Sequence, residues 1–239
     1  MKLFNSHSLK LRPEEELDLF LNGKLRIIQS KNGYRFSVDA VWLADFATVR
    51  KGDVVVDLGT GCGVILLILL LKKEISYAVG VEIQKLLACQ AHRNAILNGF
   101  KNKMYVVVGD VKSIPLAQNF ADVVVCNPPY RKKGSGRINP DPSKAIARHE
   151  LLISLDEIIL AAKRILKKKG RLAMIYPAER MAEVIAKLKK YSFEPKRIQI
   201  VYPELSSRAT LFMVEAYLNA RSGLIVEPPI IDQNEKITG

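Results

Sequence analysis

From residue 53 onwards, short apolar segments alternate with longer segments that have the apolar spacing of helices. The first short segment, 54–58, is a valine-rich, nearly unbroken apolar run, as a strand buried on both faces requires. Strands that alternate with helices in this way form a mostly parallel sheet with helices on both faces. The sequence therefore predicts an α/β fold whose last strand can run antiparallel. The predicted strands are 54–58, 77–81, 104–108, 121–126, 171–176, 196–202 and 210–218, and the predicted helices are 64–72, 84–98, 154–168 and 178–190.

The first fifty residues show a different pattern. Segments 25–29 and 33–36 have the composition of two short strands joined by a turn at Lys31-Asn32. A helix is expected to begin at Ser37, because serine caps helices well. Residues 1–50 are therefore predicted to form a strand and helix extension that packs on a core domain of residues 51–220. Residues 221–239 are predicted to form a C-terminal tail.

The balance of charge favours an anionic partner. The 239 residues include 37 Lys and Arg against 24 Asp and Glu, which gives a formal net charge of +13. Nucleic acid is the first candidate for such a partner, and a lysine-rich, heat-resistant surface is the alternative explanation.

The sequence gives no sign of a membrane span, a disulfide framework or a metal site. Its longest apolar run, residues 64–71, is far shorter than the about 20 residues that cross a bilayer. Cys62, Cys89 and Cys126 are widely separated and form no Cys-x-x-Cys pair, so neither a disulfide nor a zinc site is expected. We therefore expect a cytoplasmic protein that binds no metal and no membrane.

A glycine-rich turn, Asp57-Leu-Gly59-Thr-Gly61-Cys-Gly63, joins the first predicted core strand to its helix. Glycines there let the backbone approach a ligand closely, because open α/β sheets bind ligands beyond the carboxyl ends of their strands. Val64 stands where the third glycine of a dinucleotide-binding G-x-G-x-x-G would fall. Asp57 would also repel a pyrophosphate but attract the cationic amine of S-adenosylmethionine. Asp57, Gly59 and Gly61 are therefore predicted to bind S-adenosylmethionine rather than NAD.

Two further acidic residues end the next two predicted strands. The carboxylate of Glu82 can accept hydrogen bonds from both hydroxyls of a ribose. Asp110 can accept from the exocyclic amine of an adenine, and the backbone N–H of Val111 can donate to the same ring. Each acid alone could instead cap a helix or face solvent. Acids at three successive strand ends favour a cofactor site.

The motif Asn127-Pro128-Pro129-Tyr130 follows the fourth predicted strand. Consecutive prolines fix φ and lack N–H donors, so this turn is stiff and presents hydrogen-bond acceptors. The side-chain oxygen of Asn127 and the carbonyl of Pro128 can hold an amino group, and Tyr130 can stack on a base. These residues are predicted to be catalytic, with Asn127 also beside the cofactor. A purely structural proline turn is the alternative.

Basic residues follow the acceptor motif, and a second basic cluster lies further along the chain. The first group is predicted to bind RNA phosphates and comprises Arg131, Lys132, Lys133 and Arg137. The second cluster, within residues 163–171, could bind RNA or complement a helix dipole, and the sequence leaves this choice open. His149-Glu150 is expected to anchor a loop rather than to act as an acid–base pair.

Motif by motif, residues 53–130 resemble the class I (Rossmann-like) S-adenosylmethionine methyltransferases. The segment Gln29-Ser-Lys-Asn-Gly33-Tyr-Arg-Phe-Ser37-Val-Asp39-Ala and the acceptor motif are further similar to the bacterial tRNA(Val) adenine-N6 methyltransferase family, which modifies the adenine beside the anticodon. The resemblance covers residues 20–218. It implies a Rossmann-like sheet of seven mostly parallel strands with a short N-terminal hairpin extension. It also implies that residues 29–40 close over the cofactor, through Phe36 and Asp39.

The leading hypothesis is an RNA adenine-N6 methyltransferase that acts on tRNA. Guanine-N2 methyltransferases of ribosomal RNA and glutamine-N5 methyltransferases of release factors share the acceptor motif. The charge of +13 disfavours the glutamine enzyme. A nicotinamide oxidoreductase would need the third glycine, and a non-catalytic RNA-binding protein would not need the acceptor motif. The sequence does not determine the oligomeric state, the protein partners or which RNA is modified.

Overall fold

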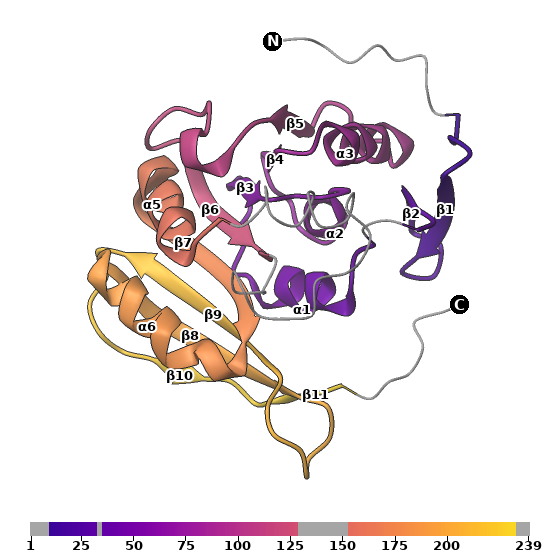
Figure 1. The fold of residues 1–239 in the computed structure, drawn as a ribbon. Helices are drawn as coiled ribbons and strands as arrows, with labels where there is room; N and C mark the ends of the chain where they lie inside the picture. Colours follow the sequence, from indigo (N-terminus) through magenta and orange to yellow (C-terminus); the bar gives the residue numbers. More distant parts are fainter. Residues whose placement is uncertain (1–9, 33–34, 129–152, 233–239) are drawn as a thin grey trace, which may run out of the picture.

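The structure, a computed structural model, describes residues 10–32, 35–128 and 153–232. A long sheet with helices on both faces forms most of the molecule, and a separate two-stranded sheet lies beside it (Figure 1). The small sheet pairs strands β1 (Glu15–Phe20) and β2 (Leu25–Ser30), and helix α1 (Val38–Phe46) follows it.

The main sheet has the strand order β10-β8-β9-β7-β6-β3-β4-β5, and β11 also pairs with β8. Its elements are, in chain order, β3 (Val54–Leu58), α2 (Val64–Lys72), β4 (Tyr77–Glu82), α3 (Lys85–Leu97), β5 (Met104–Val108), η1 (Val111–Ser113), β6 (Ala121–Cys126), α5 (Leu155–Ile165), β7 (Leu166–Pro177), η2 (Ala178–Arg180), α6 (Met181–Lys190), β8 (Phe193–Tyr202), β9 (Leu211–Leu218), β10 (Ile225–Val226) and β11 (Ile230–Ile231).

Strands β7, β6, β3, β4 and β5 are parallel neighbours, whereas β9 runs antiparallel between β7 and β8. The predicted Rossmann-like sheet of seven mostly parallel strands is confirmed, and β9 is the expected antiparallel strand. Two strands of two residues each, β10 and β11, extend this sheet along β8.

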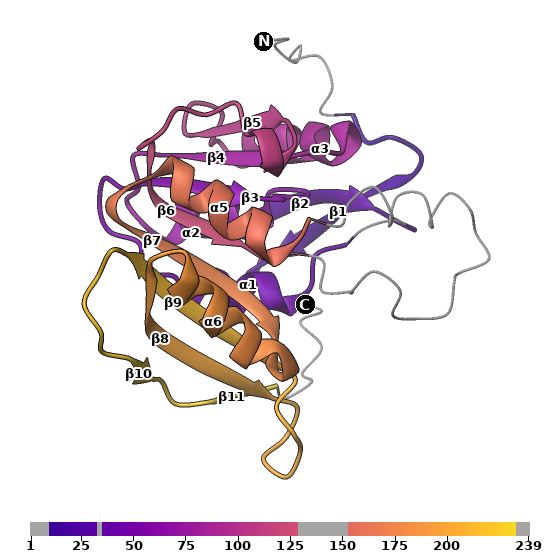
Figure 2. The same cartoon turned by 60° about the vertical axis from the view of Figure 1, so that its left-hand side comes forward.

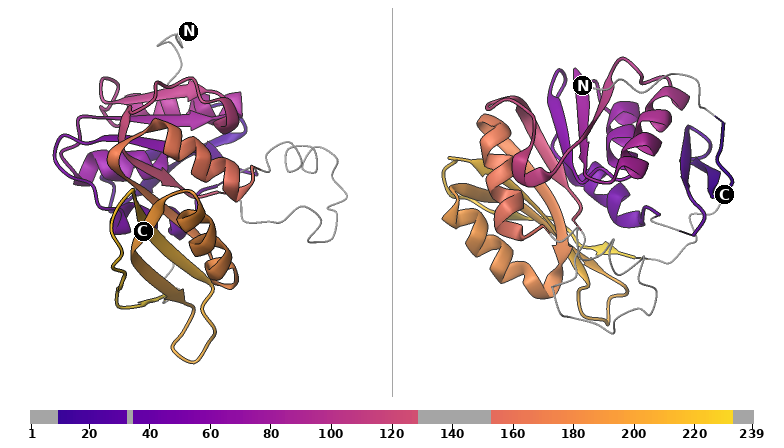
Figure 3. Two further views of the ribbon diagram at one scale, coloured as in Figure 1. Left: turned by 90° about the vertical axis from the view of Figure 1, so that its left-hand side faces the viewer. Right: turned by 45° about the horizontal axis from the view of Figure 1, so that its top comes forward.

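Helices cover the two faces of the main sheet and enclose a hydrophobic cluster on each face. Residues of α1, α2 and α3 belong to one cluster, and residues of α5 and α6 belong to the other (Figure 2). Figure 3 shows α5 and α6 together on their face of the sheet. Because successive strand side chains point to opposite faces, Val55 joins the first cluster and Val56 the second.

Helix α2 is apolar up to its last residue, Lys72, and every residue from Val64 to Leu70 is buried in the first cluster. None of the helices in the described part of the chain is both long enough and apolar enough to span a bilayer.

The N-terminal hairpin differs from the prediction. The partner of β2 is β1, which lies upstream, and the turn between them contains Leu21, Asn22 and Gly23, all with positive φ. Segment 33–36 was predicted as the partner strand, but its described residues, Arg35 and Phe36, lie outside any strand. The predicted pairing of segment 33–36 with β2 was wrong because the acidic residues of β1 are untypical of a strand. Their side chains have partners elsewhere in the fold.

Two predicted helix boundaries also move. Helix α5 begins after Ser154, whose hydroxyl and Glu157 form a capping box, but it ends at Ile165 instead of continuing to residue 168. The next strand, β7, begins at Leu166 and therefore includes the lysines that were assigned to the helix. The predicted helix 178–190 starts with the short helix η2, and α6 begins at Met181.

A buried ion pair holds the hairpin against α3. The side chains of Glu15 and Arg93 are 0% and 4% exposed, and their charged atoms lie 2.6 Å apart. Burial alone would raise the pKa of Glu15, but the hydrogen bonds from Arg93, the backbone of Arg12 and Gln90 hold it below its usual range. The carboxylate of Glu15 is therefore ionised at neutral pH and depends on its donors.

Replacing one member of this pair should destabilise the protein strongly. Arg93→Met should lower the free energy of unfolding by about 3–5 kcal/mol, because the Glu15 carboxylate would stay buried without its charge partner. Urea denaturation at neutral pH measures the change. The double variant Glu15→Gln/Arg93→Met should recover part of the loss, since no buried charge remains. A loss below about 1 kcal/mol in the single variant would mean that the pair behaves as a solvent-exposed one.

Candidate functional site

The carboxyl ends of β3, β4, β5 and β6 meet at one edge of the main sheet. The register pairs Glu82 at the end of β4 with Val108 at the end of β5, and Asp57 of β3 with Val125 of β6. The structure therefore brings together the glycine turn, the strand-end acids and the start of the acceptor motif. These segments lie far apart in the sequence.

The glycine turn leaves β3 with a backbone that side chains other than glycine rarely adopt. The φ angles of Gly59, Gly61 and Gly63 are 78°, 56° and 88°. The N–H of Gly59 donates to the carbonyl of Val81 at 2.8 Å, which ties the turn to β4. A methyl group on Gly63 would lie 2.5 Å from the side chain of Met104. Backbone conformation and close packing thus both require glycine in this turn.

Backbone donors orient the carboxylate of Glu82, which is 5% exposed. One oxygen accepts from the N–H of Gly61 at 2.9 Å, and the other accepts from the N–H of Gln84 at 2.8 Å. Burial raises the pKa of Glu82 above its usual value, although the backbone donors oppose this shift. Each oxygen can still accept a second hydrogen bond, so the carboxylate remains able to bind hydroxyl groups of a ligand.

Asp57 is completely buried, and neither of its carboxylate oxygens accepts a hydrogen bond from the described residues. Burial raises the pKa of Asp57 to about 7; the neighbouring Thr60 lowers it and the charge of Glu82 raises it. The hydroxyl of Thr60 is close, but its geometry is not that of a hydrogen bond. A buried carboxyl without donors is costly unless a ligand supplies them. This orphaned group fits the cationic amine of S-adenosylmethionine.

Asp110 performs the structural role that the sequence offered as an alternative. One of its oxygens accepts from the N–H of Lys112 at 2.9 Å and thereby caps η1, which Val111 begins. The preceding Gly109 donates its N–H to the carbonyl of Glu82 at 3.0 Å, so this segment is tied to the end of β4. The cap uses one carboxylate oxygen, and the second remains able to accept from a ligand.

The acceptor motif starts beside the glycine turn. Asn127 is half-buried and Pro128 is buried directly after β6. The thiol of Cys126 donates to the carbonyl of Leu58 at 3.2 Å, which ties the end of β6 to the end of β3. The remaining predicted acceptor and RNA-binding residues lie outside the described residues: Tyr130, Arg131, Lys132, Lys133 and Arg137.

Phe36 lies between the hairpin and α1, and Asp39 lies in the first turn of α1. The ring of Phe36 meets that of Phe20 edge-on at a centroid distance of 5.1 Å, and its N–H donates to Gln29 at 3.4 Å. Burial raises the pKa of Asp39, Ser37 lowers it through a hydrogen bond, and the charge of Asp232 raises it. The hairpin therefore positions this segment. Its closure over the cofactor stays a prediction.

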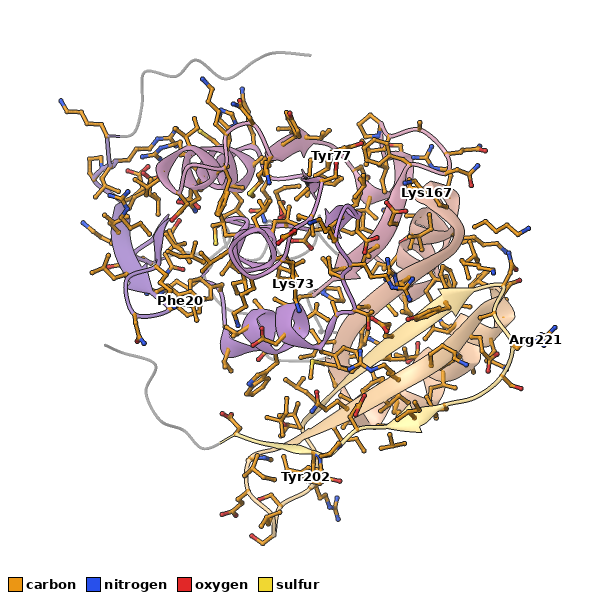
Figure 4. All side chains as sticks on the ribbon, turned by 180° about the vertical axis from the view of Figure 1, so that it is seen from behind. Phe20, Lys73, Tyr77, Lys167, Tyr202 and Arg221 are labelled. Atoms are coloured by element: carbon orange, nitrogen blue, oxygen red, sulfur yellow. The ribbon has the colours of Figure 1, made fainter. Side chains whose placement is uncertain are left out.

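Three residues of the second basic cluster have partners within the fold, at the end of the sheet opposite the acceptor motif. Lys167 pairs with Asp122 at 2.8 Å, and the largely buried Arg171 pairs with Asp53 at 2.6 Å. The guanidinium of Arg164 donates to the carbonyl of Ile114. Tyr77 and Lys167 mark the amino-terminal ends of β4 and β7 in Figure 4. These charges stabilise buried polar groups away from the acceptor motif.

Cys62, Cys89 and Cys126 are free thiols. Burial raises the pKa of Cys62 to about 12 and that of Cys126 well above its usual value, so both stay protonated at neutral pH. Among the residues that the structure describes, no group of His, Cys, Asp and Glu is arranged to hold a metal ion.

Two features near the site were not predicted from the sequence. Ile83 follows Glu82, and its apolar side chain is 44% exposed. Asn94 of α3 and Asn98, which caps its C-terminal end, bind the backbone of β2. The available signals were an apolar residue directly after a strand-end acid, and two asparagines one turn apart in a predicted helix, where asparagine is unfavourable.

Comparison with known proteins accounts for this arrangement. Residues 49–220 match a family described as the methyltransferase domain. The chain belongs to this family. It is an S-adenosylmethionine-dependent methyltransferase, and the expected class I fold and cofactor are confirmed.

Relatives of this methyltransferase are similar over most of the chain. A protein from Porphyromonas gingivalis strain W83, named tRNA1(Val) (adenine(37)-N6)-methyltransferase, is 31% identical over 176 residues, which are 70% of this chain and 68% of that protein. A protein of the same name from Aliivibrio salmonicida is 29% identical over 161 residues, 67% of this chain and 68% of that protein. A solved structure from Agrobacterium tumefaciens, described as a predicted O-methyltransferase, has a TM-score of 0.64 at 23% identity and covers 83% of this chain and 89% of its own. It shows the shared fold.

The burial of Asp57 predicts how cofactor affinity changes with pH. Affinity for S-adenosylhomocysteine, which keeps the amine, should fall as the pH drops below about 7, because the Asp57 carboxyl becomes protonated there. A protonated carboxyl cannot pair with an ammonium group, so binding near neutral pH should release a proton. Calorimetry in buffers of different ionisation enthalpy measures that proton.

Asp57→Asn is the matched control for this experiment. The variant should bind the ligand more weakly, and its affinity should lose most of the pH dependence. The pH dependence that remains should come from Glu82, whose pKa is also raised. A wild-type affinity that stays constant from about pH 6 to pH 8 would contradict the assignment of Asp57 to the amine.

Proposed function

We propose that this methyltransferase transfers a methyl group to N6 of an adenine in RNA, with tRNA as the substrate. The observation that carries the proposal is the position of Asn127 and Pro128, the described start of the acceptor motif, directly after β6, whose Val125 pairs with Asp57 of β3. The relatives named tRNA1(Val) (adenine(37)-N6)-methyltransferase support both the adenine and the tRNA. The net charge of +13 supports a polyanionic substrate.

The glycine turn and the first two acids would bind the amino acid and ribose parts of the cofactor. S-adenosylmethionine supplies an electrophilic methyl group on a sulfonium. Asp57 would accept from its amine, and the remaining lone pairs of Glu82 would accept from the ribose hydroxyls. Gly59 and Gly61 would let the backbone approach the ligand closely because they carry no side chain.

The neighbouring residues would bind the adenine of the cofactor. The oxygen of Asp110 that does not cap η1 would accept from the exocyclic amine, and the N–H of Val111 would donate to a ring nitrogen. The exposed side chain of Ile83 offers apolar surface to the ring. Phe36 and Asp39, held by the hairpin, would cover the site from the opposite side.

The acceptor residues would position the amino nitrogen of the substrate. The side-chain oxygen of Asn127 and the carbonyl of Pro128 would each accept one N6–H bond, and Tyr130 would stack on the adenine. These bonds hold the nitrogen lone pair toward the methyl group. The nitrogen would form its bond to the methyl carbon as the sulfur–carbon bond breaks, S-adenosylhomocysteine would leave with the bonding electrons, and the nitrogen would then lose a proton to solvent. No strong base is needed before the transfer, so alignment supplies much of the acceleration.

The direct test identifies the methylated product. The protein is incubated with isotopically labelled S-adenosylmethionine and total tRNA, and the digested nucleosides are analysed by mass spectrometry. N6-methyladenosine is the expected product. Label in N2-methylguanosine would identify guanine, and not adenine, as the acceptor. Label in protein, when total lysate is the substrate, would identify a protein amide as the acceptor.

Removing the side-chain amide of Asn127 should separate catalysis from cofactor binding. Asn127→Ala should lower turnover about a hundredfold, because the loss of one acceptor misaligns the amino nitrogen. Affinity for S-adenosylhomocysteine, measured by calorimetry, should change much less. Turnover within about threefold of wild type would remove Asn127 from the proposed mechanism.

The basic residues after the acceptor motif should bind phosphates. Lys132→Glu/Lys133→Glu should weaken tRNA binding and reduce the slope of log affinity against log salt by about 2, since each lost phosphate contact lowers it by about 1. Lys163→Glu/Lys168→Glu is the matched control, because it changes the net charge equally near the amino-terminal end of β7. Equal effects of the two variants on the slope would contradict a specific role for Lys132 and Lys133.

A further inference from the structure

We propose that Asn94 is a positioning residue that locks the glycine turn to the N-terminal hairpin and thereby sets the affinity for the amino acid part of the cofactor. The proposal rests on the proposed function, because it takes the glycine turn as the cofactor site. Asn94 lies on α3 and does not itself face that site. It would act through the backbone of Cys62, which stands inside the turn between Gly61 and Gly63.

The amide of Asn94 is fully buried and bonds to two separate segments. Its nitrogen donates to the carbonyl of Ile28 on β2 at 3.0 Å and to the carbonyl of Cys62 at 3.0 Å. Its oxygen accepts from the N–H of Ile28 at 2.7 Å. Both N–H groups and the oxygen are therefore used, and one side chain joins the hairpin to the glycine turn.

Asn98 makes the same pair of bonds to β2 one helical turn later. Its oxygen accepts from the N–H of Arg26 at 2.8 Å, and its nitrogen donates to the carbonyl of Arg26 at 2.7 Å. Four helical residues rise about 6 Å and two strand residues about 6.8 Å, so the amides match alternate residues of β2. The two asparagines thus bind the backbone N–H and C=O groups of β2 as a neighbouring strand would. Of these two side chains, Asn94 also bonds to the glycine turn.

The glycine turn is held at consecutive residues from two sides. Glu82 accepts from the N–H of Gly61, and Asn94 donates to the carbonyl of Cys62, a residue that is 1% exposed. Without Asn94 that buried carbonyl would lose its donor, and the glycines around it would give little resistance to a shift of the turn.

The hairpin end of the link also contacts the segment that precedes α1. Gln29, next to Ile28 on β2, accepts from the N–H of Phe36. Asn94 therefore fixes the separation between the glycine turn and the segment that precedes α1. A residue that only stabilised the fold would have no effect on which part of the cofactor is recognised.

The test compares Asn94→Ala with Asn98→Ala, using two ligands. S-adenosylhomocysteine carries the amino acid part, and 5′-methylthioadenosine lacks it. Asn94→Ala should lose about tenfold in affinity for S-adenosylhomocysteine, equivalent to about 1.4 kcal/mol and typical of one buried hydrogen bond, with little change for 5′-methylthioadenosine. Asn98→Ala should bind both ligands like wild type, because the bonds that it removes go to Arg26 of β2 and to the backbone carbonyl of Asn94, and not to the glycine turn. Circular dichroism confirms that each variant is folded.

Several outcomes separate this proposal from the proposed function. Equal losses for both ligands in Asn94→Ala, or an unchanged affinity for both, would overturn the positioning role. Failure of the wild-type protein to bind S-adenosylhomocysteine would instead overturn the cofactor assignment. If Asn94→Ala does not fold, hydrogen exchange of the wild-type protein decides the matter. S-adenosylhomocysteine should then slow exchange in residues 25–30 as well as in the glycine turn, and protection confined to the turn would overturn the proposal.

Discussion

The site depends on a carboxyl group that the fold buries without a partner. The parallel register of β3 with β4 and β6 places Asp57 in the centre of the sheet, where water cannot reach it. Glu82 is almost as buried but accepts two backbone N–H bonds, whereas Asp57 accepts none from the described residues. The same end of the sheet therefore holds Glu82, whose hydrogen bonds are made within the fold, and Asp57, which still needs a donor. A cationic amine completes the second without disturbing the first.

The hairpin and α3 show how the fold holds this edge in place. A two-stranded hairpin alone is only marginally stable, so it needs another element against which to pack. Here α3 supplies the buried Arg93 as partner of Glu15, and two asparagines that bind the free backbone edge of β2. Because Asn94 also reaches the glycine turn, docking of the hairpin and the shape of the cofactor loop become linked properties. The hairpin is therefore part of the site as well as a cover for the core.

The sequence predicted the central sheet well and the peripheral contacts poorly. Valine-rich runs such as 54–58 identify buried strands by composition alone, and an acid at the end of such a strand has few structural reasons to be there. By contrast, three of the six residues of β1 are acidic, and one of these, Glu15, is buried only because Arg93 lies near it in space. The lysines of residues 167–169 looked like a helix end, but Lys167 belongs to β7 and pairs with Asp122. Contacts between residues so distant in the chain leave no local pattern.

The charges of the main sheet differ between its two edges in a way that bears on RNA binding. At the amino-terminal edge, Arg171 and Lys167 are matched by acids within the fold. At the carboxyl edge, Asp57 and Glu82 would repel an approaching phosphate backbone. In the proposed reaction the cofactor brings an ammonium and a sulfonium to this edge and so removes that repulsion. Cofactor and RNA then favour each other's binding, and the effect is reciprocal by thermodynamic linkage. In the proposed function, the carboxyl group that would bind the amine of the cofactor would thereby also make RNA binding depend on the cofactor being present.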